Sequence, residues 1–343
     1  MKLSRIKYAV CRKLLACSLL FCLPLAGCGS NADEAQETQE MPEENYDDLI
    51  SVGFSQIGSE SIWRTANTES IQDALTTENG YFLIYSNARQ KQENQIKAIR
   101  SFISQRVDYI VFSPVTENGW ETVLEEAKDA EIPVIMVDRR IKVDDDSLYT
   151  AWIGTDAEEE GRKAGEWLEQ YLEKEGKEDE EVNIVILQGT TGSSAQTGRS
   201  KGFDSVAEKH DNWYVLAHKN GDFTTARGKE VMAEFLTMFK DIDVVVSQND
   251  DMTLGALEAM EEAGLEGNGG MTIISFDAAS EALRLVEQGI ISVDVECNPL
   301  QGPYIDEVIK KIEAGEEIEK EYIVEEQVFT QENVSEYLPD RKY

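Results

Sequence analysis

Cysteine and histidine are scarce in this sequence of 343 residues. Four of the five cysteines lie within the first 28 residues, and the two histidines are His210 and His218. This distribution excludes a disulfide-stapled core, and the Cys and His spacings that hold structural zinc are missing as well. We therefore expect no metal and no other cofactor.

Positive charge is also scarce. Lysine and arginine total 32 against 67 aspartates and glutamates, which gives a formal net charge of −35. A chain of this charge repels nucleic acid and anionic lipid, so its composition argues against a nucleic-acid partner. The runs of glutamate, such as residues 158–160, are most simply interpreted as solvated helix faces.

Catalytic and nucleotide-binding motifs are missing too. No GxSxG, HExxH or GxGxxG motif occurs, and the glycine-rich stretch 189–202 lacks the spacing of a phosphate loop. An ordinary strand-to-helix turn is favoured there. Asp250 and Asp251 could imitate a glycosidase pair, but a helix N-cap at Asn249 or Asp250 is the simpler interpretation. We expect a protein that is not an enzyme.

The N-terminal residues 1–27 predict an export signal. Five basic residues and no acidic one precede the 13-residue apolar run 14–26, which is shorter than the roughly 20 residues of a membrane span. Leu25-Ala26-Gly27-Cys28 resembles a bacterial lipoprotein signal, in which Cys28 becomes the lipid-modified first residue. Residues 28–46 are polar and acidic and predict a disordered tether. We expect an extracytoplasmic lipoprotein anchored to a membrane, at the cell surface or in the periplasm.

From residue 47 onward, short apolar runs alternate with helical patterns, which predicts βαβ units and an α/β fold. The expected strands are 49–55, 81–86, 108–113, 132–137, 182–188, 212–218, 243–248, 271–276 and 290–296. Helical patterns between them include 92–105, 119–131 and 161–176. The pattern restarts near residue 150, so two doubly wound lobes with one ligand between them are the simplest architecture.

Polar side chains follow the expected strands, and parallel α/β sheets bind ligands outside the carboxyl ends of their strands. These ends are poor in lysine and rich in hydrogen-bonding groups, which indicates a largely uncharged, polyhydroxylated ligand. A hydroxyl can donate to a carboxylate and accept from a guanidinium, and Asp138 and Arg139 offer such a pair after strand 132–137. Arg140 is expected to face solvent or to pair with an acid.

Two further side chains are candidates for ligand contact. Arg199 lies in the first stretch after an expected strand and is a plausible donor. Trp63 lies near Glu60 and Arg64, a few residues past the first strand. Its ring suits helix packing and the apolar face of a sugar equally well.

Nearly the whole body resembles a known family. From about residue 49 to 300 the chain is similar to the type I periplasmic sugar-binding proteins of bacterial ABC importers, the ribose-binding group, and most of all to galactofuranose-binding proteins. The resemblance rests on VGFSQIGSESIWR (52–64), RQKQENQIKAIRSFISQRVDYIVFSPV (89–115), EAKDAEIPVIMVDRRI (126–141), LQGTTGSSAQTGRSKGF (187–203), GDFTTARGKEVM (221–232), QNDDMTLGALEAMEEAG (248–264) and SFDAASEALRLVEQG (275–289). The acidic stretch 174–183 and the lipid anchor depart from the family pattern.

The resemblance implies two Rossmann-like lobes joined by three crossings. The lobes would comprise residues 47–150 with 298–322, and 151–297 with 323–343. The sugar contacts it implies are Ser55, Glu60, Trp63, Arg64, Asp138, Arg139, Arg199, Phe223, Asn249, Asp277 and Glu296. At the last of these positions, Asn298 is the alternative to Glu296 as the sugar contact that the resemblance implies.

The resemblance further implies a function. A monomer would close on a monosaccharide, such as the furanose form of galactose or arabinose, and deliver it to the permease and ATPase subunits of an ABC importer. The alternative is a receptor that presents the bound sugar to a sensor kinase or chemoreceptor.

Overall fold

The computed structural model describes residues 48–343. The expected signal (1–27), the expected tether (28–46) and Cys28 lie outside the described residues. Within the described part of the chain, no helix is both long enough and apolar enough to cross a membrane.

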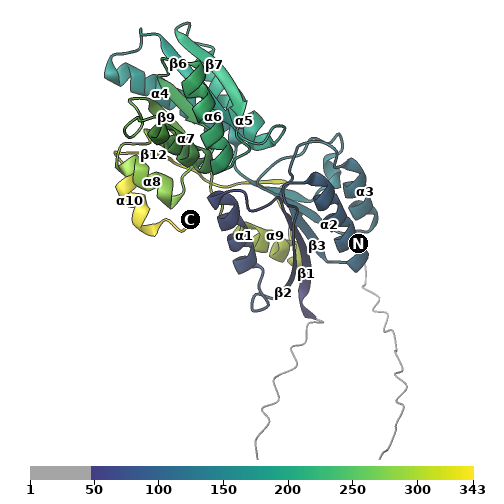
Figure 1. The fold of residues 1–343 in the computed structure, drawn as a ribbon. Helices are drawn as coiled ribbons and strands as arrows, with labels where there is room; N and C mark the ends of the chain where they lie inside the picture. The colour runs from purple at the N-terminus through teal and green to yellow at the C-terminus, as the bar shows by residue number, and fades with distance from the viewer. Residues whose placement is uncertain (1–47) are drawn as a thin grey trace, which may run out of the picture. The chain divides into compact units, whose positions relative to one another are not determined.

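The first lobe contains a six-stranded sheet. Its strands are β1 (Ile50–Gln56), β2 (Tyr81–Asn87), β3 (Tyr109–Phe112), β4 (Val134–Val137), β5 (Ala151–Gly154) and β11 (Glu321–Ile323), in the order β11-β5-β4-β3-β1-β2. Its helices are α1 (Ile62–Ala74), α2 (Gln92–Gln105), α3 (Glu121–Asp129) and α9 (Gly302–Ala314). Helices α1 and α9 cover one face of the sheet, and α2 and α3 cover the other (Figure 1).

The second lobe repeats this arrangement. Its strands are β6 (Val182–Gln188), β7 (Trp213–Asn220), β8 (Val244–Ser247), β9 (Thr272–Asp277), β10 (Val293–Glu296) and β12 (Val328–Thr330), in the order β12-β10-β9-β8-β6-β7. Helices α4 (Ala157–Glu175) and α5 (Ser194–Ala207) pack on one face. Helices α6 (Thr225–Met238), α7 (Asp250–Glu262) and α8 (Ser280–Glu287) pack on the other, with the short α10 (Val334–Tyr337) beside them.

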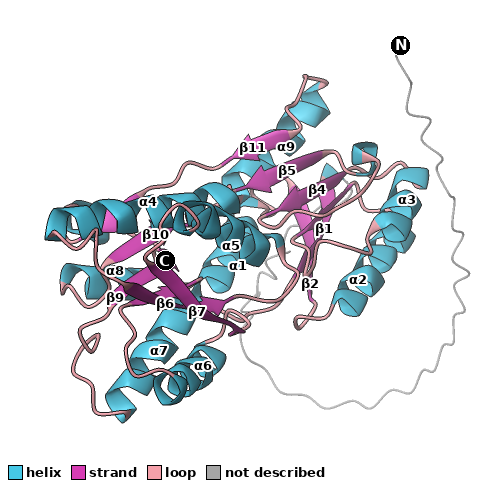
Figure 2. Cartoon of the chain, turned by 90° about the horizontal axis from the view of Figure 1, so that it is seen from above, coloured by secondary structure: helices cyan, strands magenta, loops and turns pink. Residues whose placement is uncertain are grey.

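The two doubly wound lobes expected from the sequence are confirmed, and Figure 2 shows their strands as two separate groups flanked by helices. All strand pairs are parallel except β12, which is antiparallel to β10. Strands β3, β4 and β8 are buried along their whole length. A strand covered on both faces carries a continuous apolar run instead of an alternating one, as β3, β4 and the three valines of β8 do.

All nine expected strands occur, but β5, β11 and β12 were not expected. Strands β11 and β12 have three residues each, which is too short to show a period. Strand β5 has four buried residues and pairs with β4 in the first sheet. The lobe boundary expected between residues 150 and 151 is therefore wrong, because the chain leaves the first sheet only after Gly154.

Three crossings connect the lobes. The first lies between β5 and α4, the second between β10 and α9, and the third between β11 and β12. The third crossing also runs along the end of β5, where the backbone N–H of Val324 donates to the carbonyl of Gly154 at 2.8 Å.

Candidate ligand-binding site

The predicted site residues gather at the carboxyl ends of strands from both sheets. A cavity between the two lobes is lined by Glu60, Ser61, Trp63, Arg64, Asp138, Arg139, Ala195, Arg199, Phe223, Asn249, Asp277 and Cys297. Every contact expected from the sequence belongs to this set except Ser55 and Glu296. The cavity encloses about 30 Å³, which is room for roughly two water molecules.

Arg64 organises the side of the cavity that the first lobe forms. Helix α1 begins at the N-cap Ser61, whose hydroxyl accepts from the backbone N–H of Arg64 at 3.0 Å. The Arg64 guanidinium lies 2.9 Å from the Glu60 carboxylate and 2.7 Å from that of Asp138, and all three side chains are buried. Burial opposes the charge of Arg64, but the carboxylates of Asp138 and Glu60 outweigh it and raise the pKa of Arg64.

Two residues that were not predicted support this network. The Nη1 of Arg64 donates to the side-chain oxygen of Gln56 at 3.3 Å and to the hydroxyl of Ser113 at 3.4 Å. The Ser113 hydroxyl in turn donates to Asp138 at 2.9 Å. Both supporting residues directly follow or end a strand of the first sheet, so their place at its carboxyl edge could have been inferred.

Arg139 is paired less completely. Its Nη1 donates to the carbonyl of Val115 at 3.1 Å, and its Nε lies 3.9 Å from the Asp138 carboxylate. This buried Nε has no hydrogen-bond partner among residues 48–343, and neither has the buried Oε2 of Glu60. Burial, together with the nearby charge of Arg64, lowers the pKa of Arg139 to about 10. The first lobe therefore holds one unused donor and one unused acceptor at the cavity.

Arg199 has the corresponding place in the second lobe. Its guanidinium lies 2.6 Å from Glu160 and 3.2 Å from Asp277, and it also donates to the carbonyl of Gln248. Burial opposes the charge of Arg199, but the two carboxylates outweigh it and raise its pKa. Burial raises the pKa of Asp277 as well, although Arg199 acts in the opposite direction. Each lobe thus presents carboxylate and guanidinium groups side by side.

Asn249 lines the cavity and also caps a helix. It is the N-cap of α7, where its Oδ1 accepts from the backbone N–H of Met252 at 2.9 Å. Its Nδ2 donates to the carbonyl of Phe223 at 3.3 Å. The following Asp250 is buried inside the lobe, where it accepts from the hydroxyl of Ser275 at 2.6 Å. The N-cap interpretation is confirmed, and the carboxylates at the start of α7 have structural partners.

The two aromatic residues of the cavity are held by their neighbours. The indole N–H of Trp63 donates to the carbonyl of Cys297 at 2.5 Å. The ring of Phe223 packs on the backbone of Gly189, where an added Cβ would lie 1.8 Å from its Cζ. The guanidinium of Arg139 lies over the same ring, 5.2 Å from its centre. Both rings are therefore fixed at the edge of the cavity.

Backbone strain is concentrated at the strand ends. Asp138, Phe223 and Asp277 have positive φ values of 62°, 58° and 109°. Positive φ is uncommon in residues other than glycine, and such strain is found most often at binding and catalytic sites. Three cavity-lining residues therefore occupy sharp backbone turns.

The structure does not bring Ser55 or Glu296 to the cavity. Ser55 is fully buried within β1, and its Oγ finds no partner in the described part of the chain. The carboxylate of Glu296 accepts from Arg341 at 2.6 Å and from the hydroxyl of Tyr343 at 2.9 Å, and it faces a different cavity, as does Asn298. Cys297 lines the cavity between the lobes instead, because neighbouring side chains of an extended segment point to opposite sides.

The burial of Glu160 contradicts a second expectation from the sequence. The acidic run 158–160 was expected to be solvated, but Glu160 is fully buried and bound to Arg199. It lies on the apolar face of α4, four residues before Ala164 and eight before Leu168. That helical spacing was the available signal.

Two other expectations about charged and glycine-rich segments are confirmed. Arg140 pairs with Glu321 at 2.7 Å, is partly exposed, and lies over the ring of Trp152. The stretch 189–202 is an ordinary turn followed by α5, whose N-cap Ser193 accepts from the backbone N–H of Gln196.

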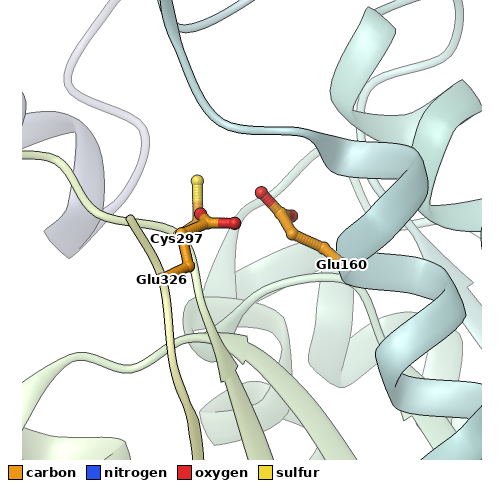
Figure 3. A group of neighbouring side chains, drawn as sticks. All are labelled: Glu160, Cys297 and Glu326. Carbon is orange, nitrogen blue, oxygen red and sulfur yellow. The ribbon is translucent and has the colours of Figure 1, made fainter. Parts of the chain in front are cut away.

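One group beside the cavity has the composition of a metal site. The carboxylate oxygens of Glu160 and Glu326 and the sulfur of Cys297 all lie within 4.8 Å of one another, and Figure 3 shows the three side chains converging. Both oxygens of Glu160 are already engaged, one by the hydroxyl of Thr155 at 2.7 Å and the other by Arg199. The guanidinium thus occupies the position where a cation would bind this carboxylate.

Comparison with known proteins agrees with this geometry. The family described as "Periplasmic binding protein domain" matches residues 52–314. Galactofuranose-binding protein YtfQ of Escherichia coli K12 is 39% identical over 297 residues, which cover 85% of this chain and 92% of the relative. The chain therefore belongs to the periplasmic binding proteins, and its two lobes have the type I fold of that family.

Two solved structures are similar in fold and in sequence. A Mycobacterium smegmatis protein in complex with β-D-fucofuranose has a TM-score of 0.82 at 43% identity, with 86% of this chain and 96% of that chain covered. The binding protein of the arabinose ABC transporter of Shewanella sp. ANA-3, bound to α- and β-L-arabinofuranose, has a TM-score of 0.78 at 42% identity, with 85% and 95% covered.

Proposed function

We propose that this protein is a monomeric solute-binding protein that captures a monosaccharide in its furanose form between its lobes, without turnover. It releases the sugar to the permease of an ABC importer. It works outside the cytoplasm, anchored to a membrane by a lipid on Cys28.

The observation that carries the proposal is the pair of unused groups in the first lobe. The Oε2 of Glu60 is a buried acceptor and the Nε of Arg139 is a buried donor, each without a partner among the described residues, and both residues line the cavity. Buried polar groups in folded proteins are nearly always hydrogen-bonded. Sugar hydroxyls can satisfy both, because a hydroxyl donates to a carboxylate and accepts from a guanidinium.

The second lobe offers complementary groups. Arg199 and Asp277 repeat the pairing of guanidinium and carboxylate, and the ring of Phe223 provides an apolar surface for the C–H groups of a sugar ring. Because both lobes contribute contacts, only the closed form satisfies all of them together. Ligand binding therefore shifts the protein toward closure.

The furanose form is supported by the relatives. The E. coli relative is named for galactofuranose, and both structures described above hold furanose sugars. The transport role is supported in the same way, since one of these structures is the binding component of an ABC transporter.

Calorimetry tests the sugar proposal. D-galactose, L-arabinose, D-fucose, D-ribose and D-glucose are titrated into the protein, and the anomeric ¹³C signal of the bound, labelled sugar reports the ring form. We expect one site per chain and a furanose signal. Binding of none of these sugars would refute the proposal, and a bound pyranose would refute the furanose form.

The lipid anchor is tested separately. Mass spectrometry of the N-terminal peptide of the protein purified from membranes should find a diacylglyceryl group on Cys28. The variant Cys28→Ser should remain unmodified. An unmodified Cys28 in the wild type would contradict the anchor and leave the sugar proposal intact.

A further inference from the structure

The cluster beside the cavity brings together side chains from the second and third crossings and from the helix that follows the first crossing. Glu160 lies in the first turn of α4, directly after the first crossing. Cys297 lies in the second crossing and Glu326 in the third. Figure 3 shows Glu160 extending from the helix toward the two neighbouring segments that carry the other side chains. The ligand-binding Arg199 is bound to this cluster through Glu160.

The charges of the cluster do not balance if both glutamates are ionised. Within the described residues, the charged groups that act most strongly on Glu326 are Glu160, Arg199 and Lys163, and the thiol of Cys297 lies beside it. Arg199 is already shared between Glu160 and Asp277. The Oε1 of Glu326 is buried and has no partner in this part of the chain. Lys163 forms no ion pair within the described residues, so Arg199 is the one cation bound to the cluster. Two adjacent, largely buried carboxylates with a single bound cation do not both ionise.

We propose that Glu326 keeps its proton in the folded protein and shares it with Glu160, and that Glu160, held in this way, positions Arg199 at the cavity. The two glutamates are thus positioning residues for a residue that contacts the ligand, and this role rests on the proposed sugar-binding function. Burial, followed by the charge of Glu160, raises the pKa of Glu326 to about 11, in agreement with the geometry.

A metal ion is the rival occupant of the cluster. It would have to displace Arg199 from Glu160, and it would need ionised forms of Glu326 and Cys297. Burial raises the pKa of the Cys297 thiol, so this ionisation is unfavourable. The guanidinium and the retained proton together satisfy the cluster without a metal.

Stability against pH tests the protonation of Glu326. An unfolded chain releases the glutamate proton above about pH 4.3, whereas the folded protein keeps it, so the contribution of Glu326 to wild-type stability falls as the pH rises. The variant Glu326→Gln keeps an N–H donor and has no proton to lose. Its unfolding temperature should therefore rise relative to that of the wild type between pH 5 and 9. Over this range the equilibrium constants for unfolding of the two proteins should diverge by up to about tenfold per pH unit. Glu325→Gln, at the exposed neighbour, should follow the wild-type profile.

Infrared spectroscopy supplies a readout that does not depend on sugar. The difference spectrum between wild type and Glu326→Gln at pH 8 should contain the C=O stretch of a protonated carboxyl group. A carboxylate band in its place, a variant less stable than the wild type at every pH, or a wild type stabilised by added Zn²⁺ and destabilised by a chelator would each overturn the proposal.

Sugar affinity tests the positioning role. Glu326→Leu, which removes the donor, and Glu160→Gln, which removes the counter-charge of Arg199, should each lower affinity at least about tenfold. Glu326→Gln should recover most of what the leucine variant loses. Equal affinity of the wild type and the folded Glu160→Gln variant would refute positioning. A wild type that binds no sugar would refute the proposed function, while the infrared and stability results would still decide the protonation of Glu326.

Discussion

The guanidinium carbon of Arg139 lies 5.2 Å from the centre of the Phe223 ring, and the two residues belong to different lobes. This distance is within the range of a cation–π contact. The cavity between them has space for roughly two water molecules, so a sugar must enlarge it by moving the two side chains apart. Arg139 therefore contributes to the contact between the lobes, and in the proposed function it also binds the sugar.

We expect Arg139→Met to weaken sugar binding and to stabilise the free protein. Loss of a charged hydrogen-bond donor should cost about 2–3 kcal/mol of affinity, or about 30- to 150-fold. Arg139 is buried, its pairing is incomplete and its pKa is lowered to about 10, so an apolar replacement should raise stability by about 1 kcal/mol. Calorimetry and thermal unfolding measure the two effects.

The neighbouring Arg140→Met is the matched control for this variant. Arg140 is partly exposed and pairs with the equally accessible Glu321, and pairs of this kind contribute about 0–1 kcal/mol. Sugar affinity should stay at the wild-type value. An equal loss of affinity in both variants would show that Arg139 has no specific role in binding.

Arg64→Met should destabilise the first lobe severely. It leaves the buried carboxylates of Glu60 and Asp138 without their shared cation, and breaking a buried ion pair costs about 3–5 kcal/mol. Chemical denaturation of the free protein measures the loss. Arg100→Met removes an exposed pair with Glu126 and should cost less than about 1 kcal/mol. Similar losses in the two variants would contradict the network around Arg64.

Asp251→Asn should change the pH dependence of stability. Asp251 accepts from the backbone N–H of Ile62 in the other lobe at 2.9 Å, and burial raises its pKa from 3.8 to about 6. Between about pH 4 and 6 the unfolded chain releases this proton before the folded protein does, so the contribution of Asp251 to wild-type stability falls over that window and levels off above it.

The asparagine variant lacks this loss. The difference between its free energy of unfolding and that of the wild type should therefore increase in favour of the variant from pH 4 to 6, by about 1–3 kcal/mol in total. Chemical denaturation at a series of pH values measures the difference. The exposed Asp241→Asn should remain parallel to the wild type. A constant offset between wild type and Asp251→Asn would show that the carboxylate does not titrate in this window.

Cys297 should resist alkylation in the native protein. Its side chain is buried, and burial raises the pKa of its thiol, whereas the reactive form of cysteine is the thiolate. Peptide mapping after treatment with iodoacetamide at pH 8 should find Cys297 unmodified in the folded protein and modified in urea. Rapid modification of the native protein would mean that this crossing opens readily.

The sequence was informative where a residue's surroundings are set by its own segment. Buried runs such as VIMV in β4 predict strands, and the polar residues Asp138 and Arg139 that follow them predict a ligand at the sheet edge. Strands β11 and β12 were missed because three residues in an edge strand show no period. Their pairing depends on tertiary contacts.

The errors at the site have a similar origin. Glu296 was placed at the cavity one position away from Cys297, and in extended chain a shift of one residue reverses the direction of the side chain. Glu160 was assigned to solvent because it belongs to a run of acids, and its burial follows from the packing of α4 on α5 and from Arg199, which is 39 residues away in the chain. Such long-range pairing of charges is not encoded by local pattern.

The contact between Gly189 and Phe223 limits how the specificity of the pocket can change. No side chain fits at position 189 while the phenyl ring stays where it is, so the second lobe offers a wall that adjusts little. A variant engineered for a larger sugar would have to shorten Phe223 first. A variant engineered for a different pattern of hydroxyls is better sought among the first-lobe residues around Glu60, where an acceptor is still unused.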